Sequence, residues 1–292
     1  MWDPGRVSKR SRINAILRLI RIEHTIFSLP FAYVGAILSG YSFSVYDAIL
    51  IAFAVFGLRT ASMAYNNIAD LEIDRKNPRS CKRPLVIGAV KLRDAWMLVL
   101  IGSLIYFISS ALLNKYALIL SPIPWIFAMT YPYAKRLHNF PHIHLGLVLG
   151  LAVCGGAVAA SGDEVKSIFE ALLSIPILYV IAVVLWVAGF DVVYSLLDVE
   201  FDRAFGLGSI PAKFGEKNAR LIALTFHIIS IVLLFLGCVV YNLSLIGIAS
   251  ITFASVLMVY QHYIARTNIP KAFNLNLIIS IVISFGIIID KL

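Results

Sequence analysis

Charged residues are scarce in this 292-residue sequence: Asp, Glu, Lys and Arg make up only 14% of it. That is about half of their usual share in soluble domains. Because a soluble protein still needs a polar surface, this scarcity excludes a soluble enzyme, and the apolar content excludes a disordered chain. Three cysteines are too few for a disulfide framework, so we expect no disulfide.

Hydrophobic residues make up 60% of the chain, against about 45–50% in soluble domains. One membrane-spanning helix takes about 20 apolar residues, and nine apolar stretches of suitable length follow one another along the chain. They cover residues 22–40, 47–66, 94–113, 115–133, 143–161, 168–190, 217–238, 242–262 and 272–290. The sequence therefore predicts an all-α integral membrane protein with nine transmembrane helices.

The links between these stretches add two expectations. The third and fourth stretches are joined at Asn114–Lys115, so we expect them to form an antiparallel hairpin. The basic N-terminal segment leads into the first apolar stretch without a small-residue cleavage site. We therefore interpret that stretch as a retained helix and not as a signal peptide.

Lysine and arginine test this layout, because both are enriched in the cytoplasmic loops of membrane proteins. Of the 25, 21 fall on one side of the predicted bundle and Arg59 lies within a span. Only Lys115, Lys166 and Lys291 fall on the other side. This distribution predicts a multi-pass protein of the cell membrane, with the N-terminus in the cytoplasm and the C-terminus outside. It also accounts for the net charge of +9 without nucleic acid as a partner.

Acidic residues gather at the predicted cytoplasmic ends of the second and sixth spans. The first cluster occupies positions i, i+4 and i+8: Asn66, Asp70 and Asp74. The second occupies positions i, i+3, i+7 and i+11: Asp191, Tyr194, Asp198 and Asp202. On a helix these steps place the side chains on one face, where like charges repel. We therefore expect a cation between them, and carboxylates are hard oxygen ligands that suit Mg²⁺.

The two clusters are separated by one fixed interval. Asp198 follows Asp70 by 128 residues, and Asp202 follows Asp74 by the same 128. The pattern predicts that residues 1–292 form a single domain with an internal repeat of four helices, about 22–133 and about 143–262, plus a ninth helix. Two such helix ends facing one another build a site rimmed by carboxylates at the inner membrane surface.

Basic residues accompany both clusters: several lie in segment 75–85, and Lys213 lies in segment 206–215. Carboxylates that hold Mg²⁺ beside Lys and Arg suit a diphosphate. Arg59 lies seven residues before Asn66, two turns deeper on the same face, and an arginine within a span is costly enough to indicate a function. Lys135 ends the fourth span on the same side, where it either contacts the phosphates or anchors the helix at the interface. A charged head near the cytoplasm with an apolar tail in the bilayer describes a polyprenyl diphosphate.

With these motifs the sequence resembles the UbiA superfamily of intramembrane aromatic prenyltransferases. The run from Asn66 to Asp74 is similar to the first Asp-rich motif of that family, and the run from Asp191 to Asp202 is similar to the second. The segment Arg21–Pro30 is most like the 4-hydroxybenzoate polyprenyltransferase branch. The similarity covers nearly the whole chain and includes Arg83-Pro84-Leu85.

The resemblance implies a nine-helix bundle around a central cavity that opens to lipid, with two Asp-rich helix ends. It implies that four carboxylates bind Mg²⁺–diphosphate: Asp70, Asp74, Asp198 and Asp202. It places three further residues in the catalytic site: Asn66, Asp191 and Tyr194. It implies diphosphate contacts from four basic residues: Arg59, Arg83, Lys135 and Lys213. Arg21 is the candidate contact for a carboxylate of the acceptor.

The predicted reaction is Mg²⁺-dependent transfer of a prenyl group from an isoprenyl diphosphate to a ring carbon of a small aromatic acceptor such as 4-hydroxybenzoate, in quinone or lipid biosynthesis. Asp191, water or the diphosphate accepts the proton that the ring loses. The same family also suits another acceptor: a naphthoate, a glyceryl lipid, a haem or a chlorophyllide. A transporter is less favoured, because transport sites lie near the midplane of the membrane. A membrane phosphotransferase is disfavoured, because the sequence has no Asp-Gly-x-x-Ala-Arg pattern.

Overall fold

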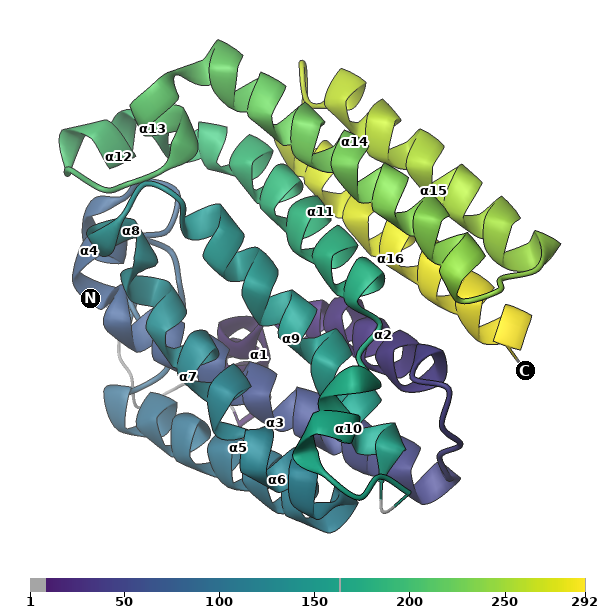
Figure 1. Cartoon of the computed structure of the whole chain (residues 1–292). Coiled ribbons are helices and arrows are strands. Elements are labelled where there is room, and N and C mark those ends of the chain that lie inside the picture. Colours follow the sequence, from purple (N-terminus) through teal and green to yellow (C-terminus); the bar gives the residue numbers. More distant parts are fainter. Residues whose placement is uncertain (1–8, 163, 292) are drawn as a thin grey trace.

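The computed structural model describes residues 9–162 and 164–291, and within these ranges every regular element is helical (Figure 1). Arg6, one of the basic residues on the predicted cytoplasmic side, lies outside these ranges. For residues 9–11 and 23–26 the description covers the backbone alone. In chain order the elements are α1 (Lys9–Ile20), α2 (Glu23–Leu38), α3 (Val45–Ala69), α4 (Leu71–Lys76), α5 (Leu92–Leu113), α6 (Lys115–Leu120), α7 (Pro122–Thr130), η2 (Tyr131–Tyr133), α8 (Ala134–Leu137), α9 (Pro141–Ser161), α10 (Ile168–Leu173), α11 (Ile177–Ser195), η3 (Leu196–Asp198), α12 (Val199–Ala204), α13 (Ile210–Phe214), α14 (Glu216–Val240), α15 (Leu245–Ile264) and α16 (Ile269–Lys291).

Seven helices in the described ranges are long and apolar enough to cross a membrane: α3, α5, α9, α14, α15, α16 and the run Ile177–Ala204 that begins with α11. The first predicted span, 22–40, is only a shorter apolar helix over Phe27–Leu38. The fourth, 115–133, breaks after Ser121, because Pro122 has no N–H with which to continue α6. The helical membrane architecture is thus confirmed, whereas the count of nine spans is not.

Two further boundaries differ from the sequence prediction in detail. The predicted span 168–190 is divided into α10 and α11, because Pro176 interrupts the helix. The link between α5 and α6 is the single residue Asn114, whose side chain accepts hydrogen bonds from the backbone N–H groups of Tyr116 and Ala117. This cap starts α6 directly after α5 ends, and the two helices pack against one another as the hairpin prediction requires.

The long helices pack in pairs, and the short helices lie together. The main pairs are α3 with α5, α11 with α14, α2 with α9 and α15 with α16. The short helices α4, α8, α12 and α13 lie at the side of the bundle that is opposite the C-terminus in Figure 1. α4 carries Asp74 and α12 carries Asp202, so the two Asp clusters reach the same side of the molecule.

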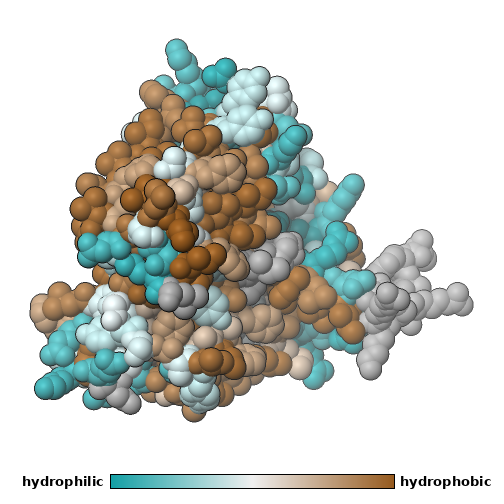
Figure 2. Space-filling view, turned by 90° about the vertical axis from the view of Figure 1, so that its right-hand side faces the viewer, coloured by the Kyte–Doolittle hydropathy of each residue, from teal (hydrophilic) through white to brown (hydrophobic). Residues whose placement is uncertain are grey.

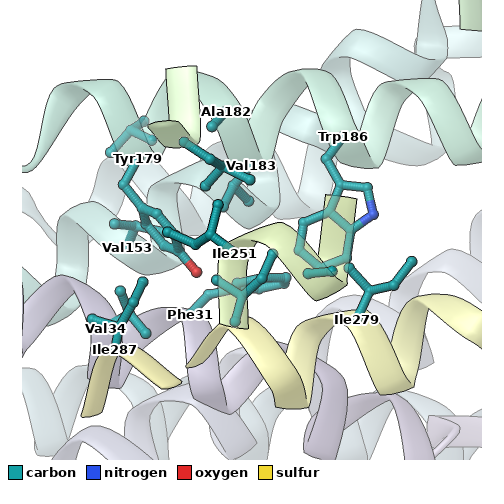
Figure 3. Close-up of a cluster of buried hydrophobic side chains, with 14 of the residues drawn as sticks. Phe31, Val34, Val153, Tyr179, Ala182, Val183, Trp186, Ile251, Ile279 and Ile287 are labelled. Carbon is teal, nitrogen blue, oxygen red and sulfur yellow. The ribbon is translucent and has the colours of Figure 1, made fainter. Parts of the chain in front are cut away.

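A large cluster of buried apolar residues lies between α2, α9, α11, α14, α15 and α16, and Figure 3 shows part of it. Phe31 packs edge-on against Trp186, with ring centroids 5.4 Å apart. The backbones of α2 and α9 lie in direct contact. A Cβ added at Gly156 would lie only 1.8 Å from the carbonyl oxygen of Ala32. Close approach through small residues is typical of helix pairs in membranes.

Large apolar side chains cover the outside of the bundle. Figure 2 shows hydrophobic residues over much of one face, with hydrophilic residues mostly near its borders. Val239 on α14 is 76% exposed and Leu100 on α5 is 62% exposed. An apolar surface of this extent marks contact with lipid, so the chain is an integral membrane protein.

Both Asp clusters lie where a long helix is interrupted. α3 ends at Ala69, and Asp70 (φ −94°, ψ 3°) precedes the six-residue helix α4. In the second cluster Asp198 has almost the same backbone conformation (φ −115°, ψ 5°) and precedes the six-residue helix α12. The expectation of one continuous helical face is therefore wrong in detail, because the helix turns at the central aspartate. The two breaks are alike, while the four-helix repeat stays a prediction.

Candidate active site

A cavity of about 350 Å³ lies where the two interrupted helices face one another. Eleven of the twelve residues predicted from the sequence are among the described residues that line it: Arg21, Arg59, Asn66, Asp70, Asp74, Arg83, Lys135, Asp191, Tyr194, Asp198 and Asp202. They come from segments that are far apart in the chain. The tertiary structure therefore gathers the two Asp clusters and their basic neighbours around one space.

In the first cluster, each aspartate is paired with one arginine. Arg136 donates to Asp70 Oδ1 over 2.8 Å and also to the carbonyl oxygen of Ala69 over 2.7 Å. Arg83 forms an ion pair with Asp74. Asn66 donates its amide N–H to Asp70 Oδ2 over 3.3 Å, which orients that carboxylate further.

In the second cluster, the partners come from the other half of the chain. Arg79 donates from Nε to Asp198 Oδ1 over 2.7 Å and from Nη2 to Oδ2, and Asn77 donates to the same Oδ1 over 3.2 Å. The Lys135 ammonium lies 3.6 Å from Asp202 Oδ2. Asp198 and Asp202 are almost fully buried, and buried carboxylates need such partners.

Each of the four carboxylates has a basic partner of its own. Within residues 9–162 and 164–291, no three His, Cys, Asp or Glu side chains lie close enough to hold a metal ion by themselves. Burial raises the pKa of Asp70 to about 6, and the neighbouring Asp74 carboxylate adds to that shift. Burial also raises the pKa of Asp74, while Arg83 opposes it. Both shifts show that burial disfavours the ionised form of these two carboxylates.

Asp191 has a different partner, the fully buried His142 near the start of α9. The distance between His142 Nδ1 and Asp191 Oδ2 is 2.7 Å. The other ring nitrogen, Nε2, accepts a hydrogen bond from the backbone N–H of Ile210 over 3.2 Å. Asp191 is thereby tied to the loop that follows the second Asp cluster.

Aromatic rings form the wall beside Asp191. The ring of Tyr194 packs on that of Phe273 with centroids 4.3 Å apart, and the Arg79 guanidinium lies 5.0 Å from the Tyr194 ring centroid. Both rings line the cavity. A cation over an aromatic face is attracted by the ring quadrupole, so Tyr194 helps to fix the arginine that holds Asp198.

Of the other predicted basic residues, two line the cavity and one does not. Arg21 lines the cavity from a left-handed backbone conformation (φ 47°) between α1 and α2, and Arg59 lines it from within α3. Lys213 is exposed, lies over the rings of Phe140 and Phe214, and is not among the described residues that line the cavity. This geometry gives no support to Lys213 as a diphosphate ligand.

A second chamber of about 200 Å³ adjoins the first deeper in the bundle. Five residues line both spaces: Arg59, Ser62, Ala128, Val148 and Leu149. Arg59 and several hydroxyl groups are the polar part of the second chamber's lining. The other side chains are mostly apolar and include Leu58, Leu113 and Ile123. The polar cavity therefore leads into an apolar space, which suits a ligand with an anionic head and a hydrocarbon tail.

Sequence reasoning missed four residues of the site: Asn77, Arg79, Arg136 and His142. Arg79 stands in the basic segment that accompanies the first cluster, four residues before Arg83, and Arg136 directly follows Lys135, so their positions held a usable signal. His142 lies 49 residues from Asp191, and no motif or spacing in the sequence connects the two.

The fold defines a membrane-embedded helical protein, and its site joins a polar cavity to an apolar chamber. Comparison with known proteins is more specific. The model of the UbiA prenyltransferase family matches residues 28–278, and the chain belongs to that family. A 4-hydroxybenzoate octaprenyltransferase of Francisella tularensis subsp. mediasiatica is 29% identical over 239 residues, which are 80% of this chain and 81% of that protein.

Solved structures agree with this assignment. The apo structure of a UbiA homolog from Aeropyrum pernix K1 is 58% identical, with a TM-score of 0.90 over 93% of this chain and 99% of that one. A UbiA homolog from Archaeoglobus fulgidus, bound to GPP and Mg²⁺, has a TM-score of 0.69 over 95% of this chain and 100% of its own. At 20% identity this second likeness shows the fold alone.

Proposed function

We propose that this protein transfers a prenyl group from an isoprenyl diphosphate to a ring carbon of a small aromatic acceptor such as 4-hydroxybenzoate. The observation that carries the proposal is one cavity with four aspartates, each paired with a basic side chain, that leads into an apolar chamber. The curated relative from Francisella is named for this acceptor. The family assignment supports the prenyl donor.

Mg²⁺ fits this site as the cofactor, with Asp70 and Asp74 on one side and Asp198 and Asp202 on the other. Mg²⁺ usually takes one or two carboxylates together with substrate phosphates, so two separated pairs suit it better than one tight cluster. The Archaeoglobus homolog is described as bound to GPP and Mg²⁺. When bound, Mg²⁺ neutralises the diphosphate oxygens and makes the diphosphate a better leaving group.

The chain's own basic residues have a second task in this proposal. Arg79, Arg83, Lys135 and Arg136 hold the carboxylates in the metal-free site. Each lines the cavity and exchanges a carboxylate partner for a phosphate oxygen when the substrate enters. Fixed cations stabilise the charge that develops on the departing diphosphate.

Bond changes follow from this arrangement. The C–O bond of the allylic diphosphate breaks, and its electron pair leaves with the diphosphate. A π-electron pair of the acceptor ring forms the new C–C bond to the allylic carbon, and the ring carbon then loses its proton. Asp191 lines the cavity beside Tyr194 and accepts that proton, while the surrounding bundle excludes water from the allylic cation.

Arg21 is the proposed contact for the carboxylate of the acceptor, since it lines the same cavity from the α1–α2 junction. An acceptor without a carboxylate, such as a glyceryl lipid, does not need this arginine. We further propose that the cavity faces the cytoplasm, because 21 of the 25 lysines and arginines fall on the loops of that side.

The test uses purified protein with Mg²⁺, geranyl or longer prenyl diphosphates and a panel of acceptors: 4-hydroxybenzoate, a naphthoate and a glyceryl phosphate. Mass spectrometry shows which acceptor gains the prenyl mass. We expect 4-hydroxybenzoate to gain it, and we expect Asp70→Ala and Asp198→Ala to abolish turnover while the protein stays folded in the membrane. Glu72→Ala is the control, because Glu72 lies on α4 in an exposed pair with Arg75.

Two results would contradict the proposal. Full activity in either aspartate variant refutes the metal assignment, and prenylation of another acceptor alone refutes the aromatic carboxylate. Solute flux across vesicles without release of diphosphate would identify a transporter instead.

A further inference from the structure

We infer that His142 is a positioning residue that holds the Asp191 carboxylate in the orientation required for turnover. The inference rests on the proposed function, because it concerns the acceptor side of the same cavity. His142 is fully buried, whereas Asp191 lines the cavity. His142 therefore acts on the reaction only through Asp191.

The hydrogen bonds of His142 determine its tautomer. Ile210 N–H points at Nε2 over 3.2 Å, so Nε2 must present a lone pair. The ring proton of the neutral imidazole is consequently on Nδ1, and Nδ1–H donates to Asp191 Oδ2 over 2.7 Å. A backbone N–H cannot tautomerise, which makes this assignment stable.

The local fold explains why the Ile210 N–H is available. Ile210 is the first residue of α13, and the first N–H groups of a helix have no partner within it. The loop that leads into α13 is anchored two residues before Ile210, where Gly208 N–H donates to the carbonyl oxygen of Lys135 over 2.6 Å. The N-terminus of α13 therefore fixes the His142 ring, and the ring in turn fixes Asp191.

The consequence for catalysis is geometric. A group that accepts a proton must lie within hydrogen-bond reach of the reacting atom. A bond to Oδ2 stops the rotation of the carboxylate about its last side-chain torsion, so Asp191 presents a constant face to the cavity. A displacement of about 1 Å at such a group lowers turnover roughly a hundredfold.

A purely structural role offers a different explanation, in which His142 only ties the α13 loop to α9. Two substitutions separate the two roles, because asparagine and glutamine each mimic one ring nitrogen. The amide nitrogen of Asn occupies the place of Nδ1, so His142→Asn keeps the donor to Asp191. The amide oxygen of Gln occupies the place of Nε2, so His142→Gln keeps the acceptor for Ile210.

The experiment measures kcat and KM for both substrates with wild type, His142→Asn and His142→Gln, together with thermal unfolding in detergent. We expect His142→Asn to keep kcat within about fivefold of wild type. We expect His142→Gln to lower kcat about a hundredfold while KM for the prenyl diphosphate changes less than about twofold. The reverse ranking assigns His142 to the loop and overturns the inference, as does equal activity of the two variants.

A double-mutant cycle gives an independent measurement if either amide variant does not fold. His142→Ala and Asp191→Asn are compared with the combined variant. If His142 works through Asp191, His142→Ala costs no further activity in the Asp191→Asn background. Multiplicative losses overturn the inference. A wild-type protein that prenylates no acceptor refutes the proposed function and this inference with it, whereas an active wild type with multiplicative losses refutes the inference alone.

Discussion

Arg79 and Asp198 lie 119 residues apart in the chain and form a two-pronged ion pair at the cavity. The pair joins the basic segment after the first Asp cluster to the centre of the second cluster. Lys135 makes a similar connection to Asp202, while Arg83 and Arg136 serve the first cluster. The basic residues therefore hold both clusters in place before any substrate is present.

Loss of Arg79 tests this arrangement. We expect Arg79→Ala to lower kcat/KM about a hundredfold, because loss of one preorganised donor to the charge that develops in the transition state costs at least about a hundredfold. Arg79→Lys should recover only part of the activity, since an ammonium cannot reproduce the two-pronged contact. Arg75→Ala is the matched control, because Arg75 pairs with Glu72 at the exposed surface. Steady-state kinetics with a saturating acceptor make the measurement, and equal activity of Arg79→Ala and Arg75→Ala would contradict the prediction.

Dependence on pH should appear in the Mg²⁺ requirement. The pKa of Asp70 is raised to about 6 in the metal-free site, chiefly by burial. Above this pH the carboxylate is charged and available to the metal, and below it a proton competes. We expect the Mg²⁺ concentration for half-maximal activity to rise by up to about tenfold per pH unit below pH 6 and to level off above pH 7. Mg²⁺ titrations at pH 5, 6, 7 and 8 measure this, and a constant midpoint would refute it.

Gly155 offers a way to shorten the apolar chamber. It lines the chamber, and a Cβ at this position meets no atom within 4 Å. Gly155→Phe should therefore fill part of the space that the prenyl tail needs without moving the backbone. We expect kcat/KM to fall at least tenfold for long prenyl diphosphates and to change little for geranyl diphosphate. Competition between two chain lengths, read by mass spectrometry, makes the comparison; equal losses for both lengths would show that the tail lies elsewhere.

The next residue in the chain, Gly156, tests helix packing. A Cβ at Gly156 would lie 1.8 Å from the carbonyl oxygen of Ala32, so Gly156→Ala must push α2 away from α9. We expect a loss of about 1–3 kcal/mol in stability and a lower midpoint of thermal unfolding in detergent. Gly155→Ala, one position away on the same helix, should leave the midpoint unchanged. Identical midpoints for the two alanine variants would argue against direct contact between these backbones.

Much of the site could be predicted from local patterns. The two Asp clusters, with their fixed interval of 128 residues, indicated Asp70, Asp74, Asp198 and Asp202, and all four line one cavity. The family resemblance placed Lys213 with Lys135 among the diphosphate contacts, yet the Lys213 side chain lies over Phe140 and Phe214. The orientation of the short helix α13 decides whether Lys213 points towards the site or away from it, and the order of residues does not record that orientation.

Composition and spacing by themselves determined that this chain is a helical membrane protein and marked its two Asp clusters, because apolar runs and the intervals between acidic residues can be read from the order of residues. Only the tertiary structure decided which cation meets which carboxylate. The pairing of Arg79 with Asp198 and of His142 with Asp191 depends on the packing of helices that are distant in the chain. Buried charges and ring nitrogens need hydrogen-bond partners, and the packing of the helices determines which partners lie within reach.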